Sequence, residues 1–175
     1  MNLTQVQTLS KRTMPFGGEP ANQVEFENML GNYAMGLIGE SVELLEVYQK
    51  DAGRNEILKE LGDVAHYAVG LANLTNYQLD IILDTTDEEP CDLIDRLLIA
   101  TKNISEAAKK CIYHRHDYEN VSEDLYKVFS CINDLADAYG YYLHEVFTTN
   151  IDKLKTRYPD KFSVEDSIKR VDVNG

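Results

Sequence analysis

Residues 36–49 read GLIGESVELLEVYQ, and residues 56–72, beyond a short loop, read EILKELGDVAHYAVGLA. In both segments the apolar residues return every three or four positions, which is typical of an amphipathic helix that buries one face. The strict alternation of apolar and polar residues that marks a β-strand is not found along the chain. The sequence therefore predicts an all-α fold, a helical bundle.

Each of the two segments carries a pair of acidic residues within its apolar face. Glu40 and Glu43 form the first pair, and Glu60 and Asp63 form the second. The i, i+3 spacing directs both carboxylates of a pair to one side of a helix. A buried carboxylate without a partner is costly, so it must be protonated, ion-paired or bound to a metal ion. Few Lys or Arg residues are placed to pair with these groups, so two acid pairs on adjacent helices predict an oxygen-only site for Mg²⁺. The alternative is an ordinary exposed charged face.

Composition limits the classes of partner. The chain has 175 residues, enough for one domain with a real core, and a formal net charge of -13. This charge argues against a nucleic acid polymer as the main partner, because such binding needs clustered Lys and Arg. No segment has the length and apolarity of a signal peptide or a membrane helix, so we expect a cytoplasmic protein with no membrane partner. Three cysteines without close metal-ligand spacing are expected to be reduced structural thiols.

Local signals predict where the helices begin and end. Asn55 is the expected N-cap of the second helix, Pro90 suits the first turn of a later one, and Asn120 with Glu123 resembles a capping box. Gly140 is the expected site of a break in the last long helical pattern. The predicted segments are a polar arm containing Pro15 and Gly17, helices at about 22–49, 55–74, 90–111 and 120–158, and a short piece, YQLDIILD, at 77–84.

A weak internal repeat has a spacing of 64 residues. Residues 56–64 align with residues 120–128, and residues 71–82 align with residues 135–146. The apolar positions match, whereas Glu60 corresponds to Asp124 and Asp63 to Lys127. The first acid pair is replaced by SEAAKK around Glu106. We interpret the chain as one domain, residues 1–175, in which a metal-binding half (21–83) packs on a degenerate half (90–158) followed by a tail (159–175). Chance similarity between amphipathic helices is the alternative.

The two acid pairs, with Gly39 before the first and Gly62 inside the second, resemble the ExxE and ExxD motifs of the MazG family of all-α nucleoside triphosphate pyrophosphohydrolases. The segment NIDKLKTRYPDKFS (150–163) is similar to the C-terminal signature of that family, and VQTLSKRT (6–13) is similar to an N-terminal segment of its phage and bacterial members. The stretch from about Thr85 to Asn133 has no counterpart in a minimal member. It leaves the oligomeric state open, because these helices could replace part of a partner subunit, as in the related dimeric dUTPases.

The resemblance implies a reaction and a set of site residues. Glu40, Glu43, Glu60 and Asp63 would hold Mg²⁺, with Mn²⁺ as an alternative ion, and the enzyme would cleave a (d)NTP to the monophosphate and pyrophosphate. A homodimer is the expected assembly. The residues expected to contact substrate are Asn150, Lys153, Arg157, Tyr158 and Tyr67.

Several of these assignments have a simpler structural alternative. Lys153 and Arg157 are spaced i, i+4 and equally fit a solvated basic face. Tyr67 fits a core position better than a base-stacking position. His66 lies off the apolar stripe, where a solvent-facing or hydrogen-bonded role is expected rather than a catalytic one. For the whole protein, the alternatives are a dUTPase-like or dCTP-directed enzyme with the same metal site, and a non-catalytic helical adaptor that binds a basic protein.

Overall fold

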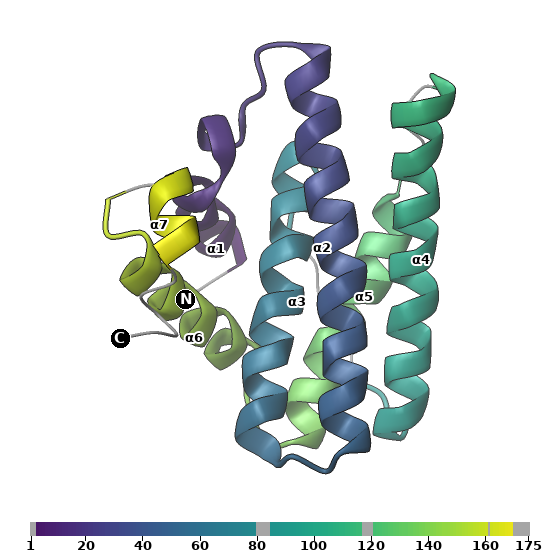
Figure 1. Cartoon of the computed structure of the whole chain (residues 1–175). Coiled ribbons are helices and arrows are strands. Elements are labelled where there is room, and N and C mark those ends of the chain that lie inside the picture. Colours follow the sequence, from purple (N-terminus) through teal and green to yellow (C-terminus); the bar gives the residue numbers. More distant parts are fainter. Residues whose placement is uncertain (1–2, 80–84, 117–120, 161, 170–175) are drawn as a thin grey trace.

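Four long helices run side by side in the computed structural model, which describes residues 3–79, 85–116, 121–160 and 162–169 (Figure 1). They are α2 (Gln23–Gln49), α3 (Arg54–Leu74), α4 (Pro90–His114) and α5 (Ser122–Ala138). The hairpin of α2 and α3 packs on the hairpin of α4 and α5, so that α2 contacts α4 and α3 contacts α5. Within the described ranges no residue is in a β-strand, and the prediction of an all-α fold is confirmed.

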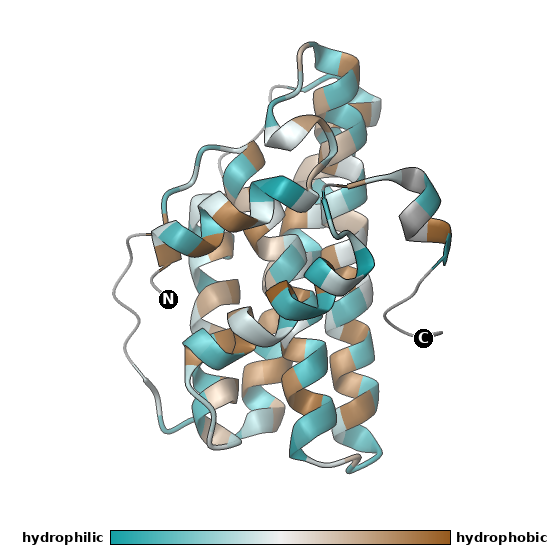
Figure 2. Cartoon of the chain, turned by 90° about the vertical axis from the view of Figure 1, so that its left-hand side faces the viewer, coloured by the Kyte–Doolittle hydropathy of each residue, from teal (hydrophilic) through white to brown (hydrophobic). Residues whose placement is uncertain are grey.

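Shorter elements lie on one side of this bundle, against α3. They are α1 (Leu3–Ser10), two 3-10 turns, η1 (Lys11–Thr13) and η2 (Pro15–Gly18), then α6 (Leu143–Arg157) and α7 (Val164–Lys169). Figure 2 shows α1 and α6 crossing in front of the long helices. Both α1 and α6 contact α3, so residues from the two ends of the chain are brought to the helix that carries the second acid pair.

Most of the expected helix boundaries agree with the structure. The Asn22 side chain accepts a hydrogen bond from the Glu25 amide at 3.0 Å and caps α2, and Pro90 opens α4. The break at Gly140 is present, with φ at +72°. The prediction that Asn55 caps α3 is wrong: Gly53 occupies the N-cap, and the Asn55 side chain accepts a hydrogen bond from the Tyr141 hydroxyl at 2.8 Å. A tertiary contact has therefore replaced the local one.

Two expected features extend outside the described residues. Asn120 of the proposed capping box is one, and α5 is seen from Ser122 with Val121 at its N-cap. Most of the segment at 77–84 is the other, although Tyr77 and Leu79 are described and are not helical.

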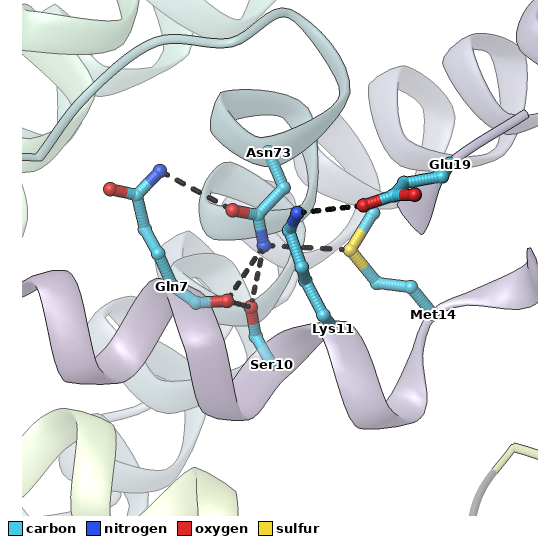
Figure 3. A network of polar contacts seen from close by, with 6 residues as sticks. All are labelled: Gln7, Ser10, Lys11, Met14, Glu19 and Asn73. Atoms are coloured by element: carbon cyan, nitrogen blue, oxygen red, sulfur yellow. Dashed lines mark hydrogen bonds and ion pairs between the residues drawn. The ribbon is translucent and has the colours of Figure 1, made fainter. Parts of the chain in front are cut away.

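The N-terminal arm is helical rather than a polar extension, because one buried amide on α3 fixes it. Asn73 donates from Nδ2 to the Ser10 hydroxyl at 2.8 Å and to the Gln7 carbonyl at 3.1 Å, and its Oδ1 accepts from Gln7 at 3.3 Å (Figure 3). Val6 and Met14 are buried on the same side. The sequence of the arm does not reveal this partner, which is more than fifty positions away.

The backbone repeats at the spacing seen in the sequence. Asp51 and Arg115, which end the first helix of each hairpin, both have left-handed φ angles, of 48° and 58°. Asn76 and Gly140 hold the equivalent position after the second helix, with φ of 55° and 72°. The residues that follow them, Tyr77 and Tyr141, each donate an amide hydrogen bond to the carbonyl five positions earlier, at 2.8 Å. These shared turns support a duplicated helical hairpin.

Candidate functional site

The antiparallel packing of α2 and α3 brings three of the four acids together. Glu40, Glu60 and Asp63 each place a carboxylate oxygen within 4.8 Å of the other two. Oxygen ligands about 2.1 Å from Mg²⁺ stand roughly 3 to 4.2 Å apart, so small side-chain rotations would let this set share one ion. Glu43 is exposed and lies outside this cluster, but it lines the same cavity.

The cluster has the electrostatic character of a cation site. Burial, followed by the charges of Asp63, Glu43 and Glu60, raises the pKa of Glu40 to about 7. Burial and then Asp63 also raise the pKa of Glu60. A bound cation would favour the ionised forms of both groups. Carboxylate oxygens are also the donors that hard divalent ions prefer, so the residues fit Mg²⁺.

Helix α6 supplies a cation that the sequence did not assign to the acids. The Lys153 ammonium contacts both oxygens of Asp63, at 2.7 and 2.6 Å, and Asn150 donates to the same carboxylate at 2.9 Å. Gly62 permits this contact, because a Cβ there would lie 3.2 Å from the Cβ of Asn150. Lys59 is a weaker partner, 3.7 Å from Glu60. The expectation that few cationic side chains reach the acids is therefore wrong for Asp63.

The acids form one wall of a cavity of about 880 Å³. Of the residues expected to contact substrate, Lys153, Arg157, Tyr158 and Tyr67 line it. Asn150 is buried, lines a smaller neighbouring cavity and orients Asp63. Lys153 thus does not form a solvated basic face.

The wall of the cavity next to the acids is aromatic. Tyr33, His66 and Tyr67 contact one another, with the rings of Tyr33 and Tyr67 6.0 Å apart and inclined at 64°. Burial lowers the pKa of His66 to about 4 and raises the pKa of Tyr67. This wall is therefore uncharged at neutral pH. The close approach of α2 and α3 places the His66 ring against both tyrosines, so this side chain lines the cavity.

Two glycines make this approach possible. A Cβ on Gly36 would lie 2.1 Å from the Tyr67 ring, and a Cβ on Gly70 would lie 2.2 Å from the Tyr33 ring. Each tyrosine therefore packs flat on the glycine of the other helix. Sequence reasoning missed Tyr33, yet the signal is present: YAMG at 33–36 on α2 and YAVG at 67–70 on α3 repeat the same pattern.

Both ends of the chain complete the cavity. Thr13 and Pro15 line it from the N-terminal turns, and Phe162 lines it from the segment after α6. The Arg12 guanidinium donates to the carbonyls of Pro159 and Asp160, at 2.8 and 3.0 Å. The Phe162 amide donates to the Arg12 carbonyl at 3.2 Å. These bonds fix the arm and the tail to each other beside the cavity.

The second hairpin has lost the acids of this site. At the repeat spacing, Glu40 corresponds to Ile104, which is buried, and Glu43 to Ala107. Asp124 accepts a hydrogen bond from Asn103 at 3.1 Å, and Lys127 pairs with Glu123 at 2.8 Å.

The aromatic wall has no counterpart there either. Tyr67 and Gly70 correspond to Cys131 and Asp134, and Arg96 contacts both, its guanidinium lying 3.2 Å from the buried Asp134 carboxylate. An ion pair therefore occupies the position that corresponds to Tyr67 and Gly70.

We therefore expect the second hairpin to hold no catalytic metal. Asp124→Asn and Glu106→Gln should leave catalytic activity within a few-fold of the wild type, because neither side chain faces a second carboxylate pair. Steady-state kinetics with saturating Mg²⁺ would measure this. A loss as large as that of a Glu60 variant would contradict the assignment of the site to one hairpin.

No helix in the described part of the chain is long and apolar enough to cross a bilayer. Comparison with family models, curated proteins and solved structures gives no match.

Proposed function

We propose that the protein is a Mg²⁺-dependent nucleoside triphosphate pyrophosphohydrolase that converts a (d)NTP and water to the (d)NMP and pyrophosphate. The observation that carries the proposal is the division of one cavity into two walls. One wall has three converging carboxylates beside Lys153, and the other has Tyr33, His66 and Tyr67. A nucleotide has the same division, with charged phosphates at one end and an uncharged heterocycle at the other. The likeness of the motifs to the MazG family supports the same conclusion.

Glu40, Glu60 and Asp63 would hold the ion, with Glu43 at the margin. Bound Mg²⁺, or Mn²⁺ in its place, supplies neutralisation of phosphate charge and lowers the pKa of water. Lys153 and Arg157 would hold phosphate oxygens through charge-assisted hydrogen bonds. A carboxylate of the cluster that is not fully engaged would accept a proton from the attacking water. Asn150 keeps Asp63 oriented throughout.

The aromatic wall would hold the nucleoside. Stacking on Tyr67 and contact with neutral His66 suit a flat, uncharged ring system. The arm and tail that Arg12 ties together would exclude water from that end of the cavity. A homodimer stays a prediction. Helices α4 and α5 complete a four-helix bundle with α2 and α3 within one chain, so the bundle itself does not require a second copy.

A substrate panel tests the proposal directly. The purified protein would be incubated with Mg²⁺ and canonical or damaged (d)NTPs, and products separated by ion-exchange chromatography. We expect monophosphate and pyrophosphate in equal amounts, with no cleavage of nucleoside diphosphates. Omission of Mg²⁺ should abolish the reaction. Absence of pyrophosphate with every triphosphate would refute the proposal and favour the adaptor.

Lys153 provides a second test, because it is expected to weaken the binding of a metal ion and to strengthen the binding of phosphate. Its contact with Asp63 competes with a metal ion, whereas its charge should attract phosphate. Lys153→Ala should raise the Michaelis constant by about ten-fold, the loss of one charge-assisted contact of about 1.4 kcal/mol. The same variant should bind Mn²⁺ more tightly in the absence of nucleotide, by titration calorimetry. Arg157→Ala should raise the Michaelis constant alone.

Lys155→Ala is the matched control for these variants. Lys155 is on the same helix, exposed and paired with Asp152 at 3.0 Å, so its removal should change neither constant. An unchanged Michaelis constant in both the Lys153 and Arg157 variants would show that these two residues of α6 do not contact substrate.

A further inference from the structure

Tyr33 has a buried hydroxyl that has no hydrogen-bond partner among the described residues. Its side chain is 2% exposed, and in the described part of the chain the hydroxyl makes no hydrogen bond. Buried tyrosine hydroxyls usually find a partner, since an unpaired buried polar group is costly. An exception in the wall of a cavity calls for a partner that comes from outside the chain.

The ring cannot turn to find a partner elsewhere. It lies against Gly70, where even a methyl group would be 2.2 Å from Cε1, and it is bordered by Tyr67 and by His66, whose ring centroid is 6.2 Å away. Because a tyrosine ring has few rotamers within a helix, this packing fixes the direction of the hydroxyl. Tyr33 is therefore held in the cavity wall rather than adapting to its contents.

The position of Tyr33 relative to the acids matches the length of a nucleotide. Tyr33 is seven residues before Glu40 on α2, two turns away on the same face, or about 10 Å along the axis. The nucleoside part of a molecule whose phosphates lie at the carboxylates would extend over a comparable distance.

We propose that the Tyr33 hydroxyl determines specificity by forming a hydrogen bond with a polar atom of the nucleoside, either on the sugar or on the base edge. This inference rests on the proposed function for the orientation of the ligand. Burial, and then the neighbouring Tyr67 and Tyr158, raise the pKa of Tyr33, so the phenol stays protonated and offers both a donor and an acceptor. A ligand lacking the matching atom would leave the hydroxyl unpaired, which is a strong basis for discrimination.

The test is Tyr33→Phe, which removes the hydroxyl and keeps the ring on Gly70. Binding of non-hydrolysable α,β-imido analogues of the common NTPs and dNTPs would be measured by calorimetry with Mg²⁺. We expect affinity for the preferred nucleotide to fall by about ten-fold, or about 1.4 kcal/mol. Affinity for inorganic tripolyphosphate, which has no nucleoside, should not change. The ligand-free variant should melt at the same temperature as the wild type or higher, because an unpaired buried hydroxyl has been removed.

Tyr48→Phe is the control, since it removes a hydroxyl from the same helix away from the cavity. A loss restricted to ribonucleotides would place the contact on the 2′-hydroxyl, a loss restricted to one base would place it on the base edge, and a uniform loss would place it on the shared part of the sugar. Wild-type affinity of Tyr33→Phe for every nucleotide would overturn the inference. So would equal losses for nucleotides and tripolyphosphate, because the effect would then be structural.

The two proposals fail in different ways. If the wild type hydrolyses nucleotides and Tyr33→Phe binds them normally, only the role of Tyr33 is lost. If the wild type binds nucleotides without releasing pyrophosphate, and Tyr33→Phe weakens binding, only the hydrolytic function is lost. If the wild type binds no nucleotide, both are wrong.

Discussion

Glu60→Gln, Asp63→Asn and Glu40→Gln are each expected to lower turnover by about a hundred-fold or more while the fold is retained. The three carboxylates lie within 4.8 Å of one another, so replacement of any one removes a ligand from the same ion. The measurement is the turnover number at saturating nucleotide and Mg²⁺. Glu43→Gln should have a smaller effect, because Glu43 is exposed and lies outside the cluster.

Unlike its turnover, the stability of the Glu40 variant should increase. In metal-free protein Glu40→Gln removes a charge from a crowded acidic site and should raise the melting temperature. The pKa of Glu40 is about 7 in the folded protein against an ordinary value of 4.5, so the folded state binds a proton more tightly than the unfolded chain. Metal-free wild type should therefore lose stability as pH rises between these values, and the gain from Glu40→Gln should grow with it.

Glu46→Gln is the control for both measurements, because Glu46 is exposed on the same helix and pairs with Lys50 at 2.9 Å. It should leave turnover and the pH dependence of stability unchanged. Near-wild-type turnover in two of the three clustered variants would exclude the metal site. A lower melting temperature in all three would show that the acids stabilise the empty fold rather than strain it.

The elements that the sequence predicted well are those governed by local rules. The period of apolar residues in α2 and α3 fixes which face is buried, and the same period places Glu40, Glu60 and Asp63 on adjoining faces. Pro90 acts within the first turn of its own helix, so its effect could be read directly. The degenerate second half stays a prediction, based on the Lys at position 127, which is incompatible with an oxygen-only site.

The features that could not be predicted depend on contacts between distant segments. Lys153 meets Asp63 across 90 positions, and the contact depends on how α6 crosses α3 at Gly62. Asn73 captures the N-terminal arm in the same way. The rotation of α2 against α3 decides whether a tyrosine belongs to the core or to a cavity. The apolar stripe places Tyr67 in the core, yet its side chain lines the cavity, and Tyr33 is deeply buried and lines the cavity as well.

Gly70→Ala should be the most destabilising of the single-methyl changes in the bundle. The new Cβ would lie 2.2 and 2.4 Å from two ring atoms of Tyr33, which is 2% exposed and is bordered by the rings of Tyr67 and His66. Overpacking of this kind costs about 2 kcal/mol or more, beyond the gain in helix propensity. Gly36→Ala makes an equally close contact with Tyr67, but that side chain is only partly buried, so its ring can move with a smaller loss of packing. Compared with Gly70→Ala, Gly36→Ala should therefore lower the free energy of unfolding less and lower the affinity for nucleotide more.

Gly39→Ala is the matched control, because it adds the same methyl group to α2 where no atom lies within 4 Å. It should stabilise the protein by about 0.5 to 1 kcal/mol through helix propensity alone. Urea unfolding of the three variants would give the free energies. Combining Gly70→Ala with Tyr33→Ala should remove most of the penalty, since the clashing ring is gone and the two changes are coupled. If Gly70→Ala were as stable as Gly39→Ala, α2 and α3 would lie further apart than the contacts between the tyrosines and glycines require. The arrangement of Tyr33, His66 and Tyr67 described for the cavity wall would then be wrong.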